Sequence, residues 1–402
     1  NLSDLFPAGA GKQVSFVASG TLSNGQAVAL KTDGTVEAIT GVAEGAGTPS
    51  VFEAASSTYI SSTFDSVNNK VVIVYSATSA TGYAVVGTVS GTSISFGTPV
   101  VFASGSPGIY WQNVVFDSNA QKVAIAYYGN GPGYAIVGTV SGTSISFGSP
   151  AQFNNQYVSY ISLAFDSTNN KVIIAYRDQN NSDYGTAIVA TVSGTSISFG
   201  TKTIFNSAGT PWISAVYDST NNKIVIAYQD YDGVSDYGTA IVGTVSGTSI
   251  SFGTAATYES DASYISAIFD STNNKIVISY RAAASSNYGK SAVGTVSGTS
   301  ISFGTPVVFN SASTYYTSAV YDPTNNKVVI AYRNIGNSSY GTSVVGTVSG
   351  TSISFGAAAV FESAQSNYIS ATYDSTNNKV VIAYQDSGNS GYGTGIVFTV
   401  GS

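Results

Sequence analysis

Aromatic residues recur along this 402-residue chain at intervals of about fifty residues, a spacing that indicates repeated structural units. They are Tyr59, Tyr110, Trp111, Tyr160, Trp212, Tyr264, Tyr315, Tyr316 and Tyr368. Rings with a polar edge can stack on sugars and make adaptable contacts with a ligand. Recurrence in every repeat also suits packing between repeats, which we expect for most of the tyrosines. Trp111 and Trp212 interrupt the tyrosine pattern, so we select them, with Tyr110, Tyr264 and Tyr316, as candidate ligand contacts.

A second candidate set consists of polar residues that follow the aromatic residues in several repeats. They are Arg177, Asp178, Gln229, Asp230, Arg281, Arg333 and Gln385. Their guanidinium, amide and carboxylate groups can form hydrogen bonds with hydroxyl groups. The two sets together predict a binding site for a glycan.

The residue types that carry out much of enzyme chemistry are missing from the sequence. The chain has no Cys, Met or His, which excludes thiol nucleophiles, imidazole bases and the commonest transition-metal ligands. Acid–base catalysis would need paired carboxylates. Acidic residues concentrate at Asp178, Asp183, Asp230, Asp232 and Asp236, but their placement differs between repeats and gives no recognisable pair. We therefore predict no catalytic residue and no cofactor, with a carbohydrate-active enzyme as an alternative.

Each repeat also carries an aromatic residue followed by aspartate and a polar turn. The aspartates are Asp65, Asp117, Asp166, Asp218, Asp270, Asp322 and Asp374. Calcium needs six or more oxygen ligands, and each turn offers one carboxylate with Asn amides. Aspartate also closes Asx-turns through its own side chain. We predict Asx-turns at these positions and no metal site.

The elements that position these residues follow from the repeat. Val-Ser-Gly-Thr-Ser-Ile-Ser-Phe-Gly begins at Val89, Val140, Val192, Val245, Val296 and Val348. Together with the seven aspartates, these phrases define seven units, each of which divides into four short strands with turns typical of antiparallel pairing. The sequence therefore predicts an all-β fold, a seven-bladed β-propeller of four-stranded antiparallel blades. A parallel β-helix is a weaker alternative, because its coils are shorter and lack internal hairpins.

Strand order within a unit decides where the candidate residues lie. The first strand ends at the aspartate, the second resembles Lys379–Tyr384, the third resembles Tyr237–Val245, and the fourth begins as at Thr248. In such a meander alternate turns fall on opposite faces. The divergent loops over residues 177–183, 229–236 and 281–287 should thus share a face with the starts of the first strands. Variable loops on a repeated scaffold are where binding usually occurs, although neutral drift would produce the same contrast.

The two ends of the chain predict how the propeller closes. The seventh unit stops at Ser402, before a fourth strand, and Gly47–Phe52 matches the end of that missing strand. We expect an N-terminal strand to complete the last blade, with part of Thr35–Ile39 supplying the rest, and so to hide an exposed edge. Residues 1–46 should form a small β appendage and residues 47–402 the propeller.

Composition limits the partners and the compartment. Only 9% of residues are charged and the net charge is −7, which argues against binding to nucleic acid or anionic lipid. No apolar run is long enough to insert into a membrane. The Ser-, Thr-, Gly- and Asn-rich composition is typical of an extracellular or virion protein. The chain begins at Asn1 rather than Met, so we expect a processed, truncated or partial sequence.

The repeats over residues 48–400 resemble propeller arrays of tailed-phage virion proteins and of bacterial surface proteins. The stretch Ala18-Ser-Gly-Thr-Leu-Ser-Asn-Gly-Gln-Ala-Val-Ala-Leu-Lys-Thr-Asp-Gly-Thr-Val is similar to segments near the start of phage tail and fibre proteins. The resemblance implies a component of the virion surface or of another extracellular assembly, attached to other assembly proteins through residues 1–46.

The leading hypothesis is a non-enzymatic tail fibre or surface appendage whose propeller binds a host-surface glycan or receptor. Alternatives are a purely structural capsid or extracellular-fibre subunit that uses the propeller for packing, and a carbohydrate-active enzyme.

Overall fold

The computed structural model describes residues 16–21, 28–38, 44–77, 81–105 and 108–401. Contacts divide the chain into two compact units, Asn1–Ala43 with Gly401–Ser402, and Glu44–Val400. In the smaller unit, β1 (Val28–Leu30) pairs with β2 (Val36–Ala38) in an antiparallel hairpin. The rest of the expected β appendage lies partly outside the described residues.

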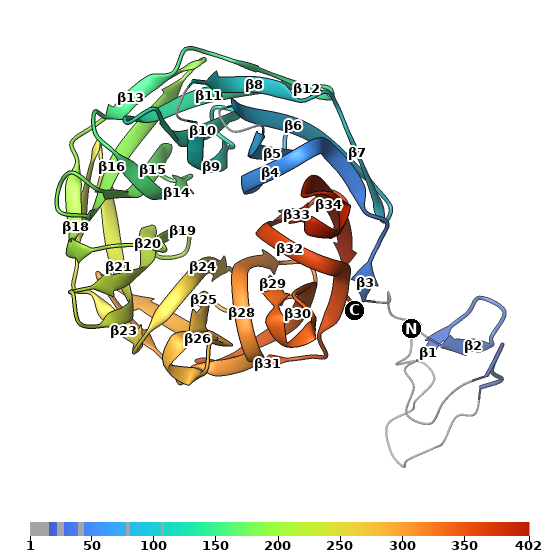
Figure 1. Ribbon diagram of the computed structural model, residues 1–402. Coiled ribbons are helices and arrows are strands. Elements are labelled where there is room, and N and C mark those ends of the chain that lie inside the picture. Colours follow the sequence, from blue (N-terminus) through green and yellow to red (C-terminus); the bar gives the residue numbers. More distant parts are fainter. Residues whose placement is uncertain (1–15, 22–27, 39–43, 78–80, 106–107, 402) are drawn as a thin grey trace. The chain divides into compact units, whose positions relative to one another are not determined.

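The larger unit is all-β, as the sequence predicts, and its sheets stand around a common centre (Figure 1). The described part of the chain contains only short 3-10 helices, η2 (Ala283–Ser285), η3 (Ile335–Asn337) and η4 (Ser387–Asn389). None of the described helices is long and apolar enough to cross a membrane. The fold is a β-propeller, and the antiparallel pairings sort its described strands into four-stranded sets, here called blades and numbered in chain order.

The first strand of each blade lies nearest the centre and ends at the aspartate of its repeat. These inner strands are β4 (Ser50–Asp65), β9 (Ile109–Asp117), β14 (Val158–Asp166), β19 (Ser214–Asp218), β24 (Ala262–Asp270), β28 (Val307–Asp322) and β32 (Ala359–Asp374). Three of them, β4, β28 and β32, are long because each begins as the outer strand of the preceding blade.

The second strands form the core of the blades. They are β5 (Lys70–Ala77), β10 (Lys122–Gly129), β15 (Lys171–Asp178), β20 (Lys223–Tyr231), β25 (Lys275–Ala282), β29 (Lys327–Asn334) and β33 (Lys379–Asp386). Their β-branched and aromatic runs are buried on both faces, because each face packs against a neighbouring blade. Ile173 of β15 and Ile226 of β20, for example, are fully buried in one cluster.

The third strands pair with the second strands, and all of them except β34 lead into Ser-Gly turns. They are β6 (Thr81–Ser90), β11 (Gly133–Ser141), β16 (Tyr184–Ser193), β21 (Asp236–Ser246), β26 (Tyr288–Ser297), β30 (Tyr340–Ser349) and β34 (Tyr392–Thr399).

The outer strand of each blade comes in two pieces, which are separated at a glycine. The separate pieces are β7 (Ser93–Phe96), β8 (Val100–Ser104), β12 (Ser144–Phe147), β13 (Ala151–Asn154), β17 (Ser196–Phe199), β18 (Thr203–Gly209), β22 (Ser249–Phe252), β23 (Ala256–Glu259), β27 (Ser300–Phe303) and β31 (Ser352–Phe355). The Ser-Ile-Ser-Phe pieces alternate exposed serine with buried isoleucine, as expected for an edge strand.

Residues near the N-terminus supply the outer strand next to β34. Ser50, Val51 and Glu53 of β4 pair with Gly395, Thr394 and Gly393 of β34. The rest of this outer strand is β3 (Gly45–Ala46), whose residues pair with Thr399 and Phe398.

The prediction that part of Thr35–Ile39 supplies the rest of this outer strand is wrong, because β3 takes that place. Val36–Ala38 pairs instead with β1 across the tight Asp33-Gly34 turn. The outer strand of the last blade therefore begins at Gly45 rather than at residue 47.

A polar side chain in each inner strand accepts a hydrogen bond from a backbone N–H of the next blade. The acceptor residues are Ser61, Asn113, Ser162, Ser214, Ser266, Ser318 and Ser370, and the donors are Val114, Leu163, Ala215, Ala267, Ala319, Ala371 and Ser62. The bond from Ser62 N to Ser370 Oγ, at 2.9 Å, joins the first and last blades. The inner strands are thus linked continuously around the centre.

The repeated aspartates close Asx-turns at the other end of the inner strands. Asp166 Oδ1 accepts hydrogen bonds from the backbone N–H groups of Thr168 and Asn169, at 3.1 and 2.9 Å. Its Oδ2 accepts from Asn169 Nδ2 at 2.7 Å. All of its contacts are thus the local ones that the sequence predicts.

Candidate binding site

One aromatic residue in each blade lies two positions before the Ser or Asn that accepts the hydrogen bond from the next blade, and it turns toward the centre of the propeller. These residues, here called the aromatic collar, are Tyr59, Trp111, Tyr160, Trp212, Tyr264, Tyr316 and Tyr368. All have left-handed backbone conformations with φ between 47° and 56°, which are uncommon for large side chains. In β14 the strand register shifts at this point, between Ser159 and Ser162. A bulge redirects a side chain, so the repeated irregularity explains how the rings point inward.

The collar is a closed circuit of neighbouring rings. Ring centroids of successive members are separated by 4.1 to 5.4 Å, including Tyr59 and Tyr368 at 5.3 Å. The two shortest separations involve the tryptophans, Trp111–Tyr160 at 4.3 Å and Trp212–Tyr264 at 4.1 Å. Every collar residue is only partly buried, so ring surface stays available after this packing.

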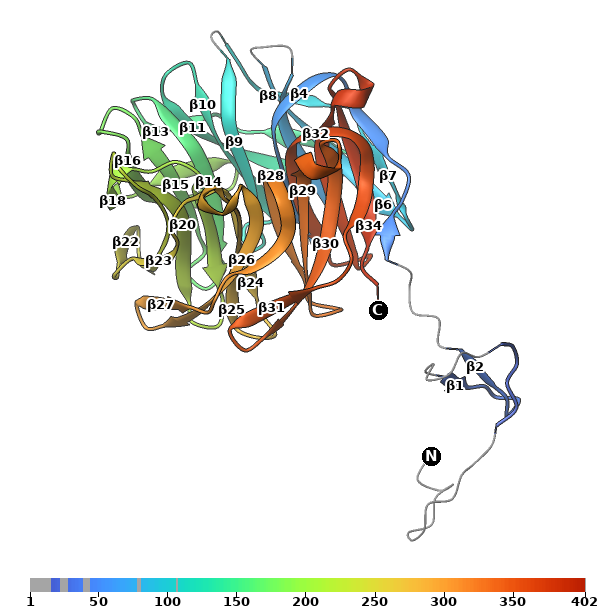
Figure 2. The same cartoon turned by 60° about the horizontal axis from the view of Figure 1, so that its bottom comes forward.

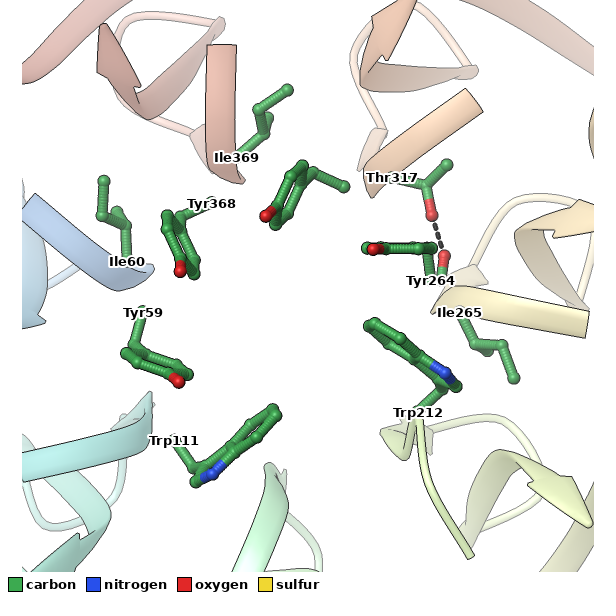
Figure 3. A pocket seen from close by; sticks show the side chains of 10 residues that line it. Tyr59, Ile60, Trp111, Trp212, Tyr264, Ile265, Thr317, Tyr368 and Ile369 are labelled. Atoms are coloured by element: carbon green, nitrogen blue, oxygen red, sulfur yellow. Dashed lines mark hydrogen bonds between the residues drawn. The ribbon is translucent and has the colours of Figure 1, made fainter. Parts of the chain in front are cut away.

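Six members of the collar surround a cavity of about 330 Å³, here called the mouth cavity. Its lining residues are Tyr59, Ile60, Trp111, Trp212, Tyr264, Ile265, Tyr316, Thr317, Tyr368 and Ile369. Figure 3 shows the labelled rings gathered around one opening, with different blades contributing them. Serines of the inner strands, such as Ser162 and Ser214, line a second cavity of about 250 Å³ together with Tyr59 and Trp111. The combination of apolar rings and a polar floor is typical of small-ligand sites.

The aromatic candidates from the sequence fall into two positions. Trp111, Trp212, Tyr264 and Tyr316 line the mouth cavity. Tyr110 lies one residue earlier, outside the lining, with its ring 5.5 Å from Tyr59.

The sequence predicts that most of the tyrosines serve in packing between repeats. The collar tyrosines Tyr59, Tyr264, Tyr316 and Tyr368 do pack against neighbouring rings, but they also line the mouth cavity. Tyr59 and Tyr368 line the mouth cavity although neither was selected. Their equivalence to Trp111 and Trp212 in the repeat was the signal that could have identified them.

Four of the polar candidates occupy one strand position beside the collar. In the ladders, Ser159 pairs with Arg177, Ser263 with Arg281, Tyr315 with Arg333, and Asn367 with Gln385. The Gln229 backbone N–H donates to Pro211 O at 3.0 Å, which places Gln229 likewise beside the collar residue Trp212. These residues lie within the last three positions of the second strands, so the prediction that they belong to loops is wrong.

Guanidinium groups lie against the collar rings. The Cζ atom of Arg177 lies 6.0 Å from the Tyr160 ring centroid, Arg281 lies 5.0 Å from Tyr264, and Arg333 lies 5.1 Å from Tyr316. These distances are within the range of cation–π contacts.

Asp178 and Asp230 lie next to this position but are absent from the lining of the mouth cavity. Successive residues of a strand point to opposite faces, so their carboxylates lie on the other side of the blade from Arg177 and Gln229. Asp178 is only 7% exposed, and Asp230 Oδ1 accepts from Asn206 Nδ2 at 2.7 Å. The structure therefore does not bring them together with the aromatic candidates.

The collar tyrosines are neutral phenols at physiological pH. Burial raises the pKa of Tyr59, Tyr160, Tyr264, Tyr316 and Tyr368 above its usual value. Neighbouring arginines oppose this effect at Tyr160, Tyr264 and Tyr316 without reversing it. Each hydroxyl can therefore both donate and accept a hydrogen bond.

Carboxylates are absent from the residues that line either central cavity. Across the described ranges, no three potential metal-binding side chains lie close enough to hold an ion. The residues at the centre can thus stack on a ligand and form hydrogen bonds with it, but they offer no acid–base pair.

No protein-family model matches the sequence, and the search of curated proteins gave no match. Solved structures share the fold at low identity. The BP39L lectin from Burkholderia pseudomallei has a TM-score of 0.62 and 11% identity, over 87% of this chain and 98% of that one. A chain of the Mitotic Checkpoint Complex has a TM-score of 0.57 and 8% identity, over 97% and 99%. NanB bound to Optactamide has a TM-score of 0.52 and 11% identity, over 87% and 70%.

Proposed function

We propose that this protein is a non-enzymatic carbohydrate-binding protein and that its ligand enters the aromatic collar. The observation that carries the proposal is the closed circuit of partly buried rings around the mouth cavity of about 330 Å³. Sugars present C–H faces that pack on aromatic rings and hydroxyl groups that need hydrogen-bond partners. The collar rings can pack against the C–H faces of a sugar. The phenol groups of the collar and the flanking Arg and Gln side chains can form hydrogen bonds with its hydroxyl groups.

Binding without turnover is favoured by the position of the carboxylates. Glycosidases generally need two carboxyl groups about 5 to 9.5 Å apart across the scissile bond. The cavity linings offer none, and Asp178 and Asp230 face away from the collar. Propellers serve both roles elsewhere, since BP39L is a lectin and NanB is a sialidase.

We further propose that the protein is displayed on a virion surface or in another extracellular assembly. The low charge and the Ser-, Thr- and Gly-rich composition support this setting, as does the resemblance of residues 18–36 to phage tail and fibre proteins. In this proposal, residues 1–46 attach to other proteins of the assembly and the propeller presents the collar to a host-surface glycan.

A glycan array of the wild-type protein, followed by Trp111→Ala and Trp212→Ala variants, tests the proposed function. We expect each substitution to weaken the best glycan by about 2 kcal/mol, roughly 30-fold, because it removes a central aromatic contact. Tyr373→Ala is the matched control, because Tyr373 lies near the C-terminal end of β32 and lines neither central cavity. Melting curves confirm that all variants fold.

The proposal fails if the wild-type protein binds no glycan, or if both tryptophan variants bind as tightly as the wild type. Absence of glycan binding combined with burial of the collar in a larger assembly would favour the structural alternative.

A further inference from the structure

The seven repeats differ in the residue that lies beside the collar. Two neighbouring blades carry an arginine there that forms no ion pair among the described residues. Arginine occupies the strand position beside the collar in three blades, as Arg177, Arg281 and Arg333. A residue with left-handed backbone lies before the third strand in the same three blades. It is Asp183, Asn287 or Ser339, with φ of 63°, 64° and 65°. The backbone at this residue is thus similar in all three, and only one of these residues carries a charge.

Arg177 is neutralised within its own blade. Its Nε lies 2.9 Å from Asp183 Oδ1 and its second terminal nitrogen lies 2.7 Å from Asp183 Oδ2. In such a bidentate pair, two nitrogen atoms of the guanidinium group each contact one carboxylate oxygen, and the carboxylate compensates the positive charge.

Arg281 and Arg333 are held by neutral oxygen atoms instead. Arg281 Nε donates to Ser263 Oγ at 2.9 Å. A terminal nitrogen of Arg333 donates to Asn367 Oδ1, and Asn367 Nδ2 is fixed by Gln385 Oε1 at 2.9 Å. Among the described residues, neither arginine forms an ion pair with a carboxylate.

The carboxyl group of Asp261 interacts electrostatically with Arg281. Burial raises the pKa of its carboxyl group, and the repulsion from Asp236 adds to this effect, while Arg281 lowers it. The Asp261 carboxylate does not form an ion pair with Arg281. Neither arginine is therefore paired with a carboxylate among the described residues, in contrast to Arg177.

The two guanidinium groups are placed together at the edge of the mouth cavity. The Cζ atoms of Arg281 and Arg333 each lie 4.7 Å from the centroid of Tyr315. The same groups lie against Tyr264 and Tyr316, whose rings line the cavity. Arg333 Nε is buried and has no hydrogen-bond partner. Two half-buried cations and an unused donor thus border an aromatic cavity in a chain of net charge −7.

We propose that Arg281 and Arg333, with Tyr315 between them, bind the anionic group of an acidic glycan. The inference rests on the proposed function and names the chemical class of its ligand, a sugar that carries a carboxylate or a sulfate. Guanidinium groups form charge-assisted hydrogen bonds with both anions, and these bonds are about twice as strong as neutral ones. Partial burial limits screening by salt.

The test compares tetragalacturonate with its methyl ester, which has the same backbone without the charge, and with a sulfated galactose tetrasaccharide. Arg281→Gln and Arg333→Gln are the informative variants, because glutamine already occupies the same strand position as Gln229 and Gln385. Arg177→Gln is the matched control, because Asp183 already compensates that charge.

We expect the wild-type protein to bind an acidic probe at least about tenfold more tightly than the methyl ester. Arg281→Gln and Arg333→Gln should each bring the ratio of acid to ester affinity close to one, because glutamine keeps hydrogen-bond donors but loses the charge, while Arg177→Gln keeps the ratio of the wild type. Tighter binding of either the carboxylate or the sulfate supports the inference and identifies the anion.

Equal binding of acid and ester, unaffected by the variants, would overturn the inference and leave the proposed glycan site standing. If Arg177→Gln lost the preference for the acidic probe as fully as the other two variants, the assignment of the anion site to Arg281 and Arg333 would also be overturned. If no probe binds and the array is empty, both the inference and the proposed function fail.

Discussion

A single added methyl group at Gly200 should destabilise the protein by about 3 kcal/mol, whereas the same change at Gly356 should cost less than about 0.5 kcal/mol. A Cβ atom on Gly200 would lie 1.8 Å from the backbone oxygen of Thr248. Backbone of the neighbouring blade cannot retreat from this contact without moving the blade. A Cβ atom on Gly356 would meet nothing closer than the Val345 oxygen at 3.7 Å.

The difference between the two glycines follows from the way the chain ends. Every Phe-Gly corner before Gly356 packs on the threonine of the Ser-Gly-Thr turn in the next blade, as Gly304 does on Thr351. The blade after Gly356 has its outer strand supplied by β3 and β4, so this corner has no such neighbour.

Urea unfolding of Gly200→Ala and Gly356→Ala measures both effects in one experiment. Equal stability losses at the two positions would show that the contact between blades is not the cause.

Removal of residues 1–56 is expected to abolish soluble folding, whereas removal of residues 1–43 should leave the propeller intact. The longer deletion takes away the strand that pairs with β34 and leaves an exposed edge, which promotes aggregation. It also removes Phe52, which is 5% exposed, and the hydrogen bond of 3.0 Å from Tyr75 to Glu53. Loss of a buried phenylalanine typically costs about 3 to 5 kcal/mol even without the strand.

Soluble yield, size-exclusion chromatography and melting temperature compare the two deletions. We expect a monodisperse protein with an unchanged melting temperature from the shorter deletion, because its break precedes Glu44, where the larger compact unit begins. A soluble, cooperatively melting protein from the longer deletion would contradict the role of the N-terminal strand.

The features that the sequence predicted correctly are those that repeat locally. The four strands of each repeat show β-branched runs and tight turns, and the Asx-turns need only an aspartate and the backbone that follows it, as at Asp166. The match between Gly47–Phe52 and other outer strands placed the N-terminal segment next to β34.

The errors concern the register of strands and the direction of side chains. The sequence places Asp178 with Arg177, and Asp230 with Gln229, in divergent loops beside the aromatic residues. In the structure β15 and β20 continue through these residues, and alternation along a strand separates neighbours. Short segments such as Thr35–Ile39 and Gly45–Ala46 carry too few residues for composition to decide their partners.

The aromatic collar and the arginine pair Arg281 and Arg333 depend on contacts between residues that are distant in the sequence, so the sequence of one repeat does not predict them. The left-handed backbone at Trp212 or Tyr264 leaves no residue signature, because glycine would usually mark such a position. The neutral partners of Arg281 and Arg333 come from residues that are 18 and 34 positions distant in the chain.

The most direct test of the central claim uses the tryptophan fluorescence of the unmodified protein. The chain has 2 tryptophans, and both line the mouth cavity, so all of the signal comes from the proposed site. Titration with the best glycan from the array should produce a saturable change in emission whose midpoint matches the affinity from calorimetry. Calorimetric binding with unchanged tryptophan emission would place the ligand elsewhere and contradict the account.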